Sequence, residues 1–388
     1  MIGSFDNLGL DLKLVQGLAK ANIKTPTDIQ AKTIPLALEN KDIIGQSQTG
    51  SGKTLAYLLP IFQRIDTTER HTQALILAPT HELVMQIESE IKLLAQNSEF
   101  AVTSAAIIGE VNVKRQIEKL REKPHIIVGS TGRIHELIKN KKINSQTIKT
   151  IVIDEGDRLL DHDNLAAVKN VIKTTMRDRQ LMVFSATISE KALETAKNLM
   201  KDPQAITIES ETPVSTTIDH MYFISEQRDK IEILRKLIAS INPEKAIVFI
   251  NRSDDIQITT GKLQYHHISA IGIYGSADKE ERKRALEGFR SGKYQLLVAS
   301  DLAARGLDIE DVTHIINLDL PPDAKEFLHR AGRTGRVGKT GTTISIVTEQ
   351  EKQMLTSYEK MFKIKFQPKK MYKGKISDMY QGDQLTDK

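Results

Sequence analysis

The sequence of 388 residues contains no cysteine and no tryptophan, and aromatic residues make up only 5% of it. Without cysteine the chain cannot form disulfides, bind zinc through thiolates or use a thiol nucleophile, and a reducing compartment is the simplest setting. So few aromatic side chains do not suggest a base-stacking platform of the kind found in many single-strand binding proteins. Any nucleic-acid partner is therefore expected to be held mainly through its backbone.

Long apolar runs are also missing from the chain. No segment reaches the length of a membrane span, and Met1–Leu10 has neither the basic start nor the apolar core of a signal peptide. We expect a cytoplasmic protein without a membrane partner. A hydrophobic content of 39% and a charged content of 27% suit a folded chain, and the length favours two domains. The net charge of +5 suits a polyanionic partner without requiring one.

Short aliphatic runs alternate with longer helical patterns along the whole sequence, which is typical of βαβ units. We therefore expect an α/β fold of two tandem domains, each with a mostly parallel sheet flanked by helices. The candidate strands of the first half are Asp42–Gly45, Ala74–Ala78, Val102–Ile107, Ile126–Gly129, Thr150–Ile153, Leu181–Phe184 and Ala205–Ile208. Those of the second half are Met221–Ile224, Ala246–Ile250, Ile268–Tyr274, Leu296–Ala299, His314–Asn317 and Thr343–Val347.

A polar, proline-containing segment at 209–217 has no apolar periodicity and is predicted to be the linker between the domains. The first domain is then 1–208 and the second 218–366. Residues 367–388 are predicted to be a short, weakly ordered polar tail that begins with a cluster of lysines. Such a cluster could contact phosphates, but a solvated surface is the more common outcome.

The segment after the first candidate strand, residues 46–54, is predicted to be a phosphate-binding loop that leads into a helix. Gly50 and Gly52 allow backbone N–H groups to turn toward phosphates, Lys53 reaches the β and γ oxygens, and Thr54 offers a hydroxyl to Mg²⁺. Ser47 stands where the strict pattern has glycine, and the alternative is a Gly/Ser-rich turn before an ordinary helix. The residues expected to hold the nucleotide here are Ser47, Gln48, Thr49, Gly50, Ser51, Gly52, Lys53 and Thr54.

The apolar strand Thr150–Ile153 delivers an acidic cluster at its carboxyl end, which is where ligands of open α/β sheets bind. Asp154 suits a Mg²⁺ partner, and Glu155 is placed to orient or deprotonate an attacking water. The alternative is a helix start enriched in acids that favour the helix dipole.

Near the end of the second half, Arg330, Arg333 and Arg336 recur at a spacing that suits phosphates. A planar guanidinium can stabilise the charge on a transferring γ-phosphoryl group, and the second half has no phosphate loop of its own. A basic surface loop is the alternative. The pattern indicates ATP bound in a cleft between two domains.

In combination, these motifs resemble the DEAD-box family of superfamily 2 RNA helicases, from about Phe5 to about Val347. The resemblance implies two RecA-like domains. Upstream, Lys24–Gln30 is similar to the family's Q motif, which implies that the Gln30 amide recognises adenine. ATP would then be preferred over GTP. Ile23 stands where the family usually has an aromatic residue, so apolar packing would replace stacking on the base.

The same resemblance assigns further roles, residue by residue. Asp157 would accept hydroxyl contacts from Ser185 and Thr187 that couple hydrolysis to domain movement. Gly156 replaces the alanine of the name-giving tetrad, which removes no catalytic atom. Asp308 would contact the ribose, while Arg333 and Arg336 would act as arginine fingers. The residues implied in RNA binding are Pro79, Thr80, His81, Gly109, Ser130, Arg133, Arg252, Gly275 and Ser300.

Some positions in the first domain's RNA motifs depart from the family pattern. The family has arginine at His81, glycine at Glu110 and Thr-Pro at Ser130 and Thr131. Loss of an arginine fork and a carboxylate near phosphates would both weaken the hold on RNA. We therefore expect a competent ATPase that needs high RNA concentration, low salt or a partner protein to engage RNA.

The mechanism implied is cooperative binding of ATP, Mg²⁺ and single-stranded RNA, with local separation of short duplexes and little sequence preference. Two alternatives stay open: an RNA clamp or scaffold with a vestigial ATPase, and a DNA helicase of the same superfamily. We expect a monomer. The sequence names no particular RNA, pathway or partner protein.

Overall fold

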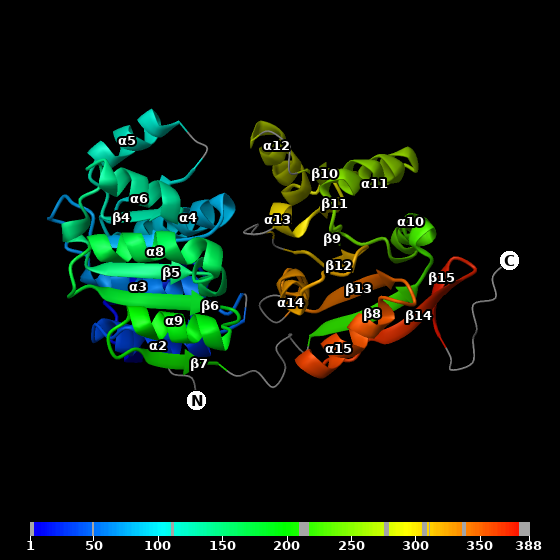
Figure 1. Ribbon diagram of the computed structural model, residues 1–388, viewed down its shortest axis with the longest axis horizontal. Coiled ribbons are helices and arrows are strands. Elements are labelled where there is room, and N and C mark those ends of the chain that lie inside the picture. Colours follow the sequence, from blue (N-terminus) through cyan, green and yellow to red (C-terminus); the bar gives the residue numbers. More distant parts are fainter. Residues whose placement is uncertain are drawn as a thin grey trace. The chain divides into compact units, whose positions relative to one another are not determined.

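The computed structural model describes residues 4–48, 50–109, 112–208, 217–274, 279–304, 309, 311–335 and 339–379 (Figure 1). The chain forms two compact units that divide between residues 209 and 210. The predicted linker therefore lies outside the described residues, except for Thr217. Neither unit contains a described helix with the length and apolar composition that crossing a membrane requires.

The first unit is built around a seven-stranded sheet in which every paired strand runs parallel, in the order β3-β4-β2-β5-β6-β1-β7. Its strands are β1 (Ile43–Gln46), β2 (Ala74–Leu77), β3 (Ser104–Ile107), β4 (Ile126–Gly129), β5 (Thr150–Asp154), β6 (Gln180–Ser185) and β7 (Gln204–Thr207). Strands β2, β4, β5 and β6 are buried along their whole length because helices cover both faces of the sheet.

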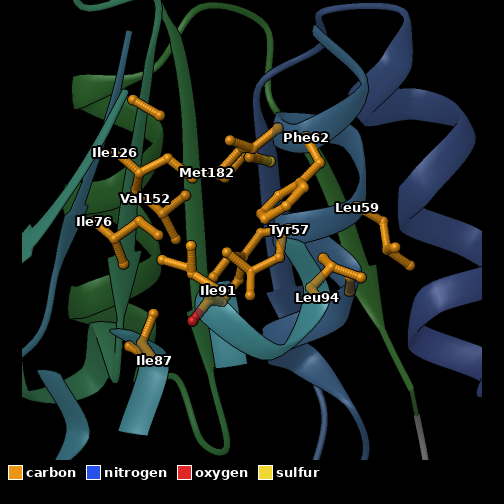
Figure 2. Close-up of a cluster of buried hydrophobic side chains, with 14 of the residues drawn as sticks. Tyr57, Leu59, Phe62, Ile76, Ile87, Ile91, Leu94, Ile126, Val152 and Met182 are labelled. Carbon is orange, nitrogen blue, oxygen red and sulfur yellow. The ribbon is translucent and has the colours of Figure 1, made fainter. Parts of the chain in front are cut away.

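Alternate side chains of these strands enter two separate cores. Ile76, Val152 and Met182 join the helices α1 (Leu12–Lys20), α2 (Asp28–Leu38), α3 (Lys53–Arg64) and α4 (His81–Ser98) on one face. Figure 2 shows this cluster, with Tyr57 and Phe62 of α3 among the strand residues. Leu75 and Ile153 point to the other face and pack with α5 (Val113–Arg121), α6 (Thr131–Lys139), α8 (His162–Thr174) and α9 (Glu190–Leu199).

The second unit contains an eight-stranded sheet in the order β10-β11-β9-β12-β13-β8-β14-β15, parallel except for its last pair. Its strands are β8 (Ile218–Ile224), β9 (Ala246–Phe249), β10 (Ala270–Ile273), β11 (Leu296–Ala299), β12 (His314–Asn317), β13 (Gly341–Val347), β14 (Gln367–Tyr372) and β15 (Lys375–Asp378). Helices α10 (Lys230–Ile241) and α11 (Ser253–Tyr265) pack on one face, and α14 (Ala324–Ala331) and α15 (Lys352–Phe362) on the other. The described residues of this unit also form α12 (Lys279–Arg290), α13 (Asp301–Ala304) and a short 3-10 helix at Gln227–Asp229.

The expected α/β class with two mostly parallel sheets is confirmed, and each candidate strand overlaps an observed one. Several ends differ. The strand predicted at Met221 begins at Ile218, and the one predicted from Ile268 begins at Ala270. A strand ends where its residues stop forming hydrogen bonds with the neighbouring strand, and local sequence does not predict that position.

The prediction of a weakly ordered tail is wrong for residues 367–378. This segment forms β14 and β15, an antiparallel hairpin that extends the second sheet. Its turn is Lys373–Gly374, whose φ angles of 48° and 75° are both left-handed, as in tight two-residue hairpin turns. Met371 and Ile376 pair across the hairpin and pack on the core of the second unit. Two apolar side chains among lysines were too weak a pattern to predict strands.

Candidate active site

The chemically important residues of the first unit follow the carboxyl ends of three adjacent strands, β5, β6 and β1. The phosphate loop follows β1, Asp154 ends β5 and Ser185 ends β6. The backbone N–H of Ser47 donates to the Ser185 carbonyl oxygen at 3.1 Å and so ties the start of the loop to β6. Because parallel strands end at the same edge, residues far apart in the sequence meet here.

The phosphate loop has the backbone that its glycines predict. Gly50 and Gly52 have φ angles of 80° and 87°, which favour glycine because a side chain there would be strained. Lys53 is the first residue of α3, and its Nζ donates to the carbonyl oxygens of Ser47 and Gln48, each at 2.6 Å. The buried hydroxyl of Ser51 has no hydrogen-bond partner among the described residues. Thr49 lies outside them.

Gln30 connects α2 to this loop. Its Oε1 accepts the backbone N–H of Thr27 at 2.9 Å and completes a capping box at the start of α2. Its Nε2 donates to the carbonyl oxygen of Gly52 at 3.0 Å. A Cβ atom on Gly52 would lie only 2.4 Å from that nitrogen, so the close approach depends on glycine. Ile23 is half-buried against the first core, and recognition of adenine by Gln30 stays a prediction.

Asp154 is buried at the end of β5 with two hydrogen bonds. Its Oδ2 accepts the Tyr57 hydroxyl and its Oδ1 the Glu155 backbone N–H, both at 2.9 Å. Burial raises the pKa of Asp154 to about 6 although Lys53 opposes the shift. Burial likewise lowers the pKa of Lys53 to about 8, against the opposing charges of Asp154, Glu155 and Asp157. The site therefore holds an acid and a base whose charged forms are both disfavoured by burial.

Tyr57 is a residue of this site that the sequence analysis missed. It lies one helical turn after Lys53, and the centre of its ring lies 5.4 Å from the centre of the Phe184 ring. Burial and the charge of Asp154 raise the pKa of its phenol well above the usual value, so it remains a donor to the carboxylate. The spacing of four residues from Lys53 on one helix was the only available signal.

Glu155 has a left-handed backbone, with φ of 50°, and precedes the short helix α7 (Gly156–Leu159). Non-glycine residues in this region are uncommon and gather at functional sites. Its Oε2 lies 3.4 Å from Nη1 of Arg158, and both side chains are partly exposed. A weak ion pair therefore holds the partly exposed Glu155 carboxylate beside α7.

Asp157 receives the hydroxyl contacts that the resemblance implied. Ser185 Oγ lies 2.7 Å from its Oδ1 and Thr187 Oγ1 lies 3.3 Å from its Oδ2, while the Asp157 N–H donates to Ser185 Oγ at 3.3 Å. A Cβ atom on Gly156 would meet Cγ1 of Val183 at 2.5 Å. Val183 thus occupies the space that an alanine methyl group would need, while the coupling role of Asp157 stays a prediction.

The predicted RNA-binding residues of this unit follow the other three neighbouring strands, β2, β4 and β3. Thr80 is the N-cap of α4 and accepts the Leu83 N–H at 3.3 Å, and Ser130 is the N-cap of α6. Pro79, next to Thr80, is half-buried. Gly109 follows β3, and a side chain there would meet open space. These four residues lie together along one stretch of the sheet edge.

Arg133, which is in the predicted RNA set, and Thr131, which departs from the family motif, are less exposed than RNA contact would favour. Arg133 is 15% exposed and pairs with Glu136 at 2.9 Å, and the side chain of Thr131 is buried. His81, the first residue of α4, is half-buried. Glu110 lies outside the described residues. The departure at Thr131 therefore changes packing under the surface, not a side chain that faces solvent.

In the second unit, Arg330 is a structural residue. It is 1% exposed, and its Nε and Nη2 each lie 2.6 Å from the carboxylate of Asp301. Further bonds go to Asn317 at 3.0 Å and Asn251 at 2.8 Å, and the guanidinium lies 4.8 Å from the centre of the Phe249 ring. Arg330 belongs to the arginine pattern predicted to bind phosphates. Its guanidinium N–H groups are instead bonded to acceptors of the protein itself.

The other predicted residues of this unit are less enclosed or are not described. Arg252 is 77% exposed near Asp255, and Ser300 is buried, with Oγ accepting the Ala303 N–H at 3.4 Å. Arg333 follows α14 and is half-buried. Gly275, Asp308 and Arg336 lie outside the described residues.

The nucleotide and its metal can be tested against these donors. Two left-handed glycines, the Lys53 ammonium, the unused Ser51 hydroxyl, Thr54 and the Asp154 carboxylate form the donor set that a Mg²⁺–nucleotide needs. The described residues contain no cluster of three or more His, Asp or Glu side chains that could hold a metal without a ligand. The Asp154 carboxylate and the Thr54 hydroxyl are ligands of the kind that Mg²⁺ takes together with phosphate oxygens, so these residues fit such a metal.

Comparison with known proteins agrees with this geometry. Residues 27–196 match the DEAD/DEAH box helicase family and 229–338 the helicase conserved C-terminal domain. The chain is 42% identical to the DEAD-box ATP-dependent RNA helicase CshC of Bacillus cereus, over 93% of this chain and 92% of that protein. It is 40% identical to the probable ATP-dependent RNA helicase YfmL of Bacillus subtilis, over 88% and 89% of the two chains.

Among solved structures, it resembles Saccharomyces cerevisiae Dbp5 bound to RNA and ADP BeF3, with a TM-score of 0.85 and 30% identity over 94% of this chain and 95% of that chain. The shared domains, the extent of the identity and the phosphate loop with its acidic partners lead to one assignment. The chain belongs to the DEAD-box family of ATP-dependent RNA helicases.

Proposed function

We propose that this enzyme uses ATP and Mg²⁺ to bind single-stranded RNA with both units and to separate short RNA duplexes locally. The proposal rests above all on the edge of the first sheet, where the nucleotide residues of β5, β6 and β1 lie beside the predicted RNA residues of β2, β4 and β3. One rigid sheet can thus carry both ligands. The named relatives, including the RNA-bound Dbp5, support the choice of RNA.

In this mechanism the phosphates lie on the loop from Ser47 to Thr54, with Lys53 released from its two carbonyl partners to reach them. Thr54 and Asp154 would hold the Mg²⁺, which when bound would supply positive charge to offset the charge that develops on the phosphates. Glu155 holds and orients the attacking water, and Tyr57 with the Glu155 N–H keeps the Asp154 carboxylate in place.

Arg333 and Arg336 are proposed to stabilise the γ-phosphoryl group, and Asp308 to contact the ribose. Asp157, Ser185 and Thr187 are proposed to transmit the state of the nucleotide to the RNA contacts. Their hydrogen bonds supply a connection that a change at the end of β6 would disturb. Arg133 would act from its ion pair with Glu136, by positioning α6.

The decisive test is Glu155→Gln, which keeps the shape of the side chain but removes the carboxylate. We expect ATP binding to persist while RNA-stimulated hydrolysis falls by about 100-fold to 10,000-fold, the range attributed to positioned general bases. Turnover would be measured with RNA and with DNA of equal length. Unchanged turnover in the variant would refute the role of Glu155, and equal stimulation by DNA would favour a DNA helicase.

A further inference from the structure

The hairpin of β14 and β15 lies in an unusually basic part of the chain. Residues 360–377 contain seven lysines and no acidic residue. Removing these seven from the 55 basic residues of the chain leaves 48 against 50 acidic ones, so the positive net charge depends on this short segment. A concentration of charge of this kind attracts polyanions much more strongly than the same charges dispersed.

The hairpin register places two of these lysines, Lys370 and Lys375, on the same face as Tyr372. Met371 and Ile376 are paired across the hairpin and pack into the core beside α10. Because side chains alternate along strands, Lys370, Tyr372 and Lys375 point to the opposite face, where Tyr372 pairs directly with Lys375. The face with Met371 and Ile376 is therefore anchored in the core, and the opposite face carries Lys370 and Lys375, while Lys369 on the anchored face is paired with Asp378.

Tyr372 gives this face a second property. It is 57% exposed beside the turn, and Nζ of Lys373 lies 5.4 Å from the centre of its ring. Two further exposed lysines come from the end of α15: Lys363 is its C-cap and Lys365 precedes β14 by two residues. Pro368 pairs with Tyr222, whose side chain packs in the core with α15, so Lys370 and Tyr372 share the α15 side of the sheet.

Lysines on an edge strand also discourage pairing with other chains, and β15 is such an edge. That role accounts for Lys375 but not for Lys363 and Lys365, which precede the hairpin, nor for an exposed aromatic ring. Among the residues that the structure describes, Lys365, Lys373 and Lys375 form no ion pair. By contrast, Lys369 of the same hairpin pairs with Asp378.

We propose that this basic hairpin face, formed by Lys370, Tyr372 and Lys375 with Lys373 of the turn, and preceded in the sequence by Lys363 and Lys365, is a second binding surface for single-stranded RNA, separate from the helicase motifs. Lysines would contact phosphates and Tyr372 would stack on an accessible base, which a single strand offers and a duplex does not. The inference rests on the proposed RNA function and adds a contact that holds RNA without nucleotide.

The test uses the full chain without nucleotide and a fluorescent single-stranded RNA, with affinity measured over a range of salt concentrations. The variant combines Lys370→Gln, Lys373→Gln and Lys375→Gln. Each lost phosphate contact on a single strand lowers the slope of log affinity against log salt by about 0.7, so the slope should fall by about 2. The matched control changes Lys236, Lys262 and Lys352 to Gln; these three exposed lysines lie on α10, α11 and α15.

Tyr372→Ala should weaken RNA binding by about tenfold, corresponding to loss of one stacked base, while Tyr372→Phe should bind like the parent chain. Because Tyr372 is largely exposed, neither change disturbs the core. An equal fall in slope for the hairpin and control variants would overturn the proposal. So would an unchanged RNA slope with lost binding to phosphatidylserine vesicles, which would assign the face to a membrane surface.

These measurements separate the two hypotheses. RNA affinity and its salt dependence are measured without ATP. The result is therefore independent of whether RNA stimulates hydrolysis. Suppose that the parent chain shows no RNA-stimulated ATPase while the hairpin variant still has the lower slope of log affinity against log salt. In that case the proposed helicase function is refuted and the second RNA-binding surface is supported. The reverse result retains the function and removes the surface.

Discussion

Buried charges have different surroundings in the two units. In the first, half-buried Lys53 and buried Asp154 lie at the carboxyl edge without a direct ion pair, and burial shifts the pKa of each toward its neutral form although their charges oppose the shift. In the second, Arg330 is joined to Asp301 by two hydrogen bonds, and buried Lys230 lies 2.8 Å from Glu351. Lys230 holds the pKa of Glu351 below its usual value even though burial alone would raise it.

This difference distinguishes buried charges that serve ligand binding from buried charges that stabilise the fold. A buried charge without a direct ion pair costs folding free energy and is retained where a ligand supplies the partner. A buried charge with a bidentate partner stabilises the fold only while both members are present, because the remaining one would be left uncompensated. The same residue types therefore have opposite roles in two similar sheets.

The largest expected effect comes from one substitution made in each unit. Asp301→Asn should lower the free energy of unfolding of the second unit by about 3 kcal/mol because Arg330 loses its charged partner in the interior. Asp154→Asn should leave the stability of the first unit unchanged or raised, because its carboxylate is already disfavoured by burial. Hydrogen exchange measured separately on the strands of each unit would report both values.

The Asp154→Asn enzyme should still lose RNA-stimulated hydrolysis, since the expected metal ligand is gone. A loss of stability in the first unit as large as that in the second would contradict the comparison.

The second prediction concerns acid. His220 is buried between Phe327 and Phe366, with Nδ1 2.5 Å from Thr343 Oγ1, and burial lowers its pKa to about 4. The unfolded chain binds a proton near pH 6.5 and the folded chain only near 4, so stability falls as the pH drops through this window, by about 3 kcal/mol in all. Urea unfolding at several pH values would measure the loss.

The matched variant for this experiment is His220→Phe, which keeps a ring in the aromatic cluster and has no titrating group. Its urea midpoint should change less between pH 6.5 and pH 4 than that of the parent chain. A variant with the same acid sensitivity would assign the effect to other residues.

A smaller effect is expected at Gly156. Gly156→Ala restores the family residue, but the new methyl group would meet Val183 Cγ1 at 2.5 Å in a buried position. Overpacking of this kind costs about 1–3 kcal/mol of folding free energy. Val183→Ala in the same chain should remove the clash, so the double variant should be more stable than the sum of the two single changes predicts. Strict additivity in thermal unfolding would exclude the contact.

The smallest effect concerns two departures from the family pattern, His81 and Glu110. His81→Arg with Glu110→Gly should lower the RNA concentration for half-maximal ATPase stimulation by about tenfold, through a new guanidinium fork and the loss of a repelling carboxylate. Its salt dependence should steepen, since one more phosphate contact is made. Glu110→Gly alone is the control, and an RNA requirement that matches the parent chain at every salt concentration would show that these side chains do not face RNA.

The sequence by itself determined the parts of the molecule whose physics is local. Gly50 and Gly52 need a left-handed backbone, Lys53 and Thr54 open a helix, and an apolar run before Asp154 forms a strand, all within a few residues of one another. Alternation of such segments was sufficient to predict two mostly parallel sheets. The contact of Ser185 with Asp157 came only from the family resemblance and is present.

Tertiary structure alone decided which side chains meet. The bond from Tyr57 to Asp154 and the contact of Gly156 with Val183 join segments that are distant or differently patterned in the sequence. Arg330 shares a motif with Arg333, yet burial and two carboxylate bonds make it a structural residue. The lysine-rich end forms a hairpin because Met371 and Ile376 pack on the core of the second unit. Whether two such side chains have a core to pack on depends on the whole fold.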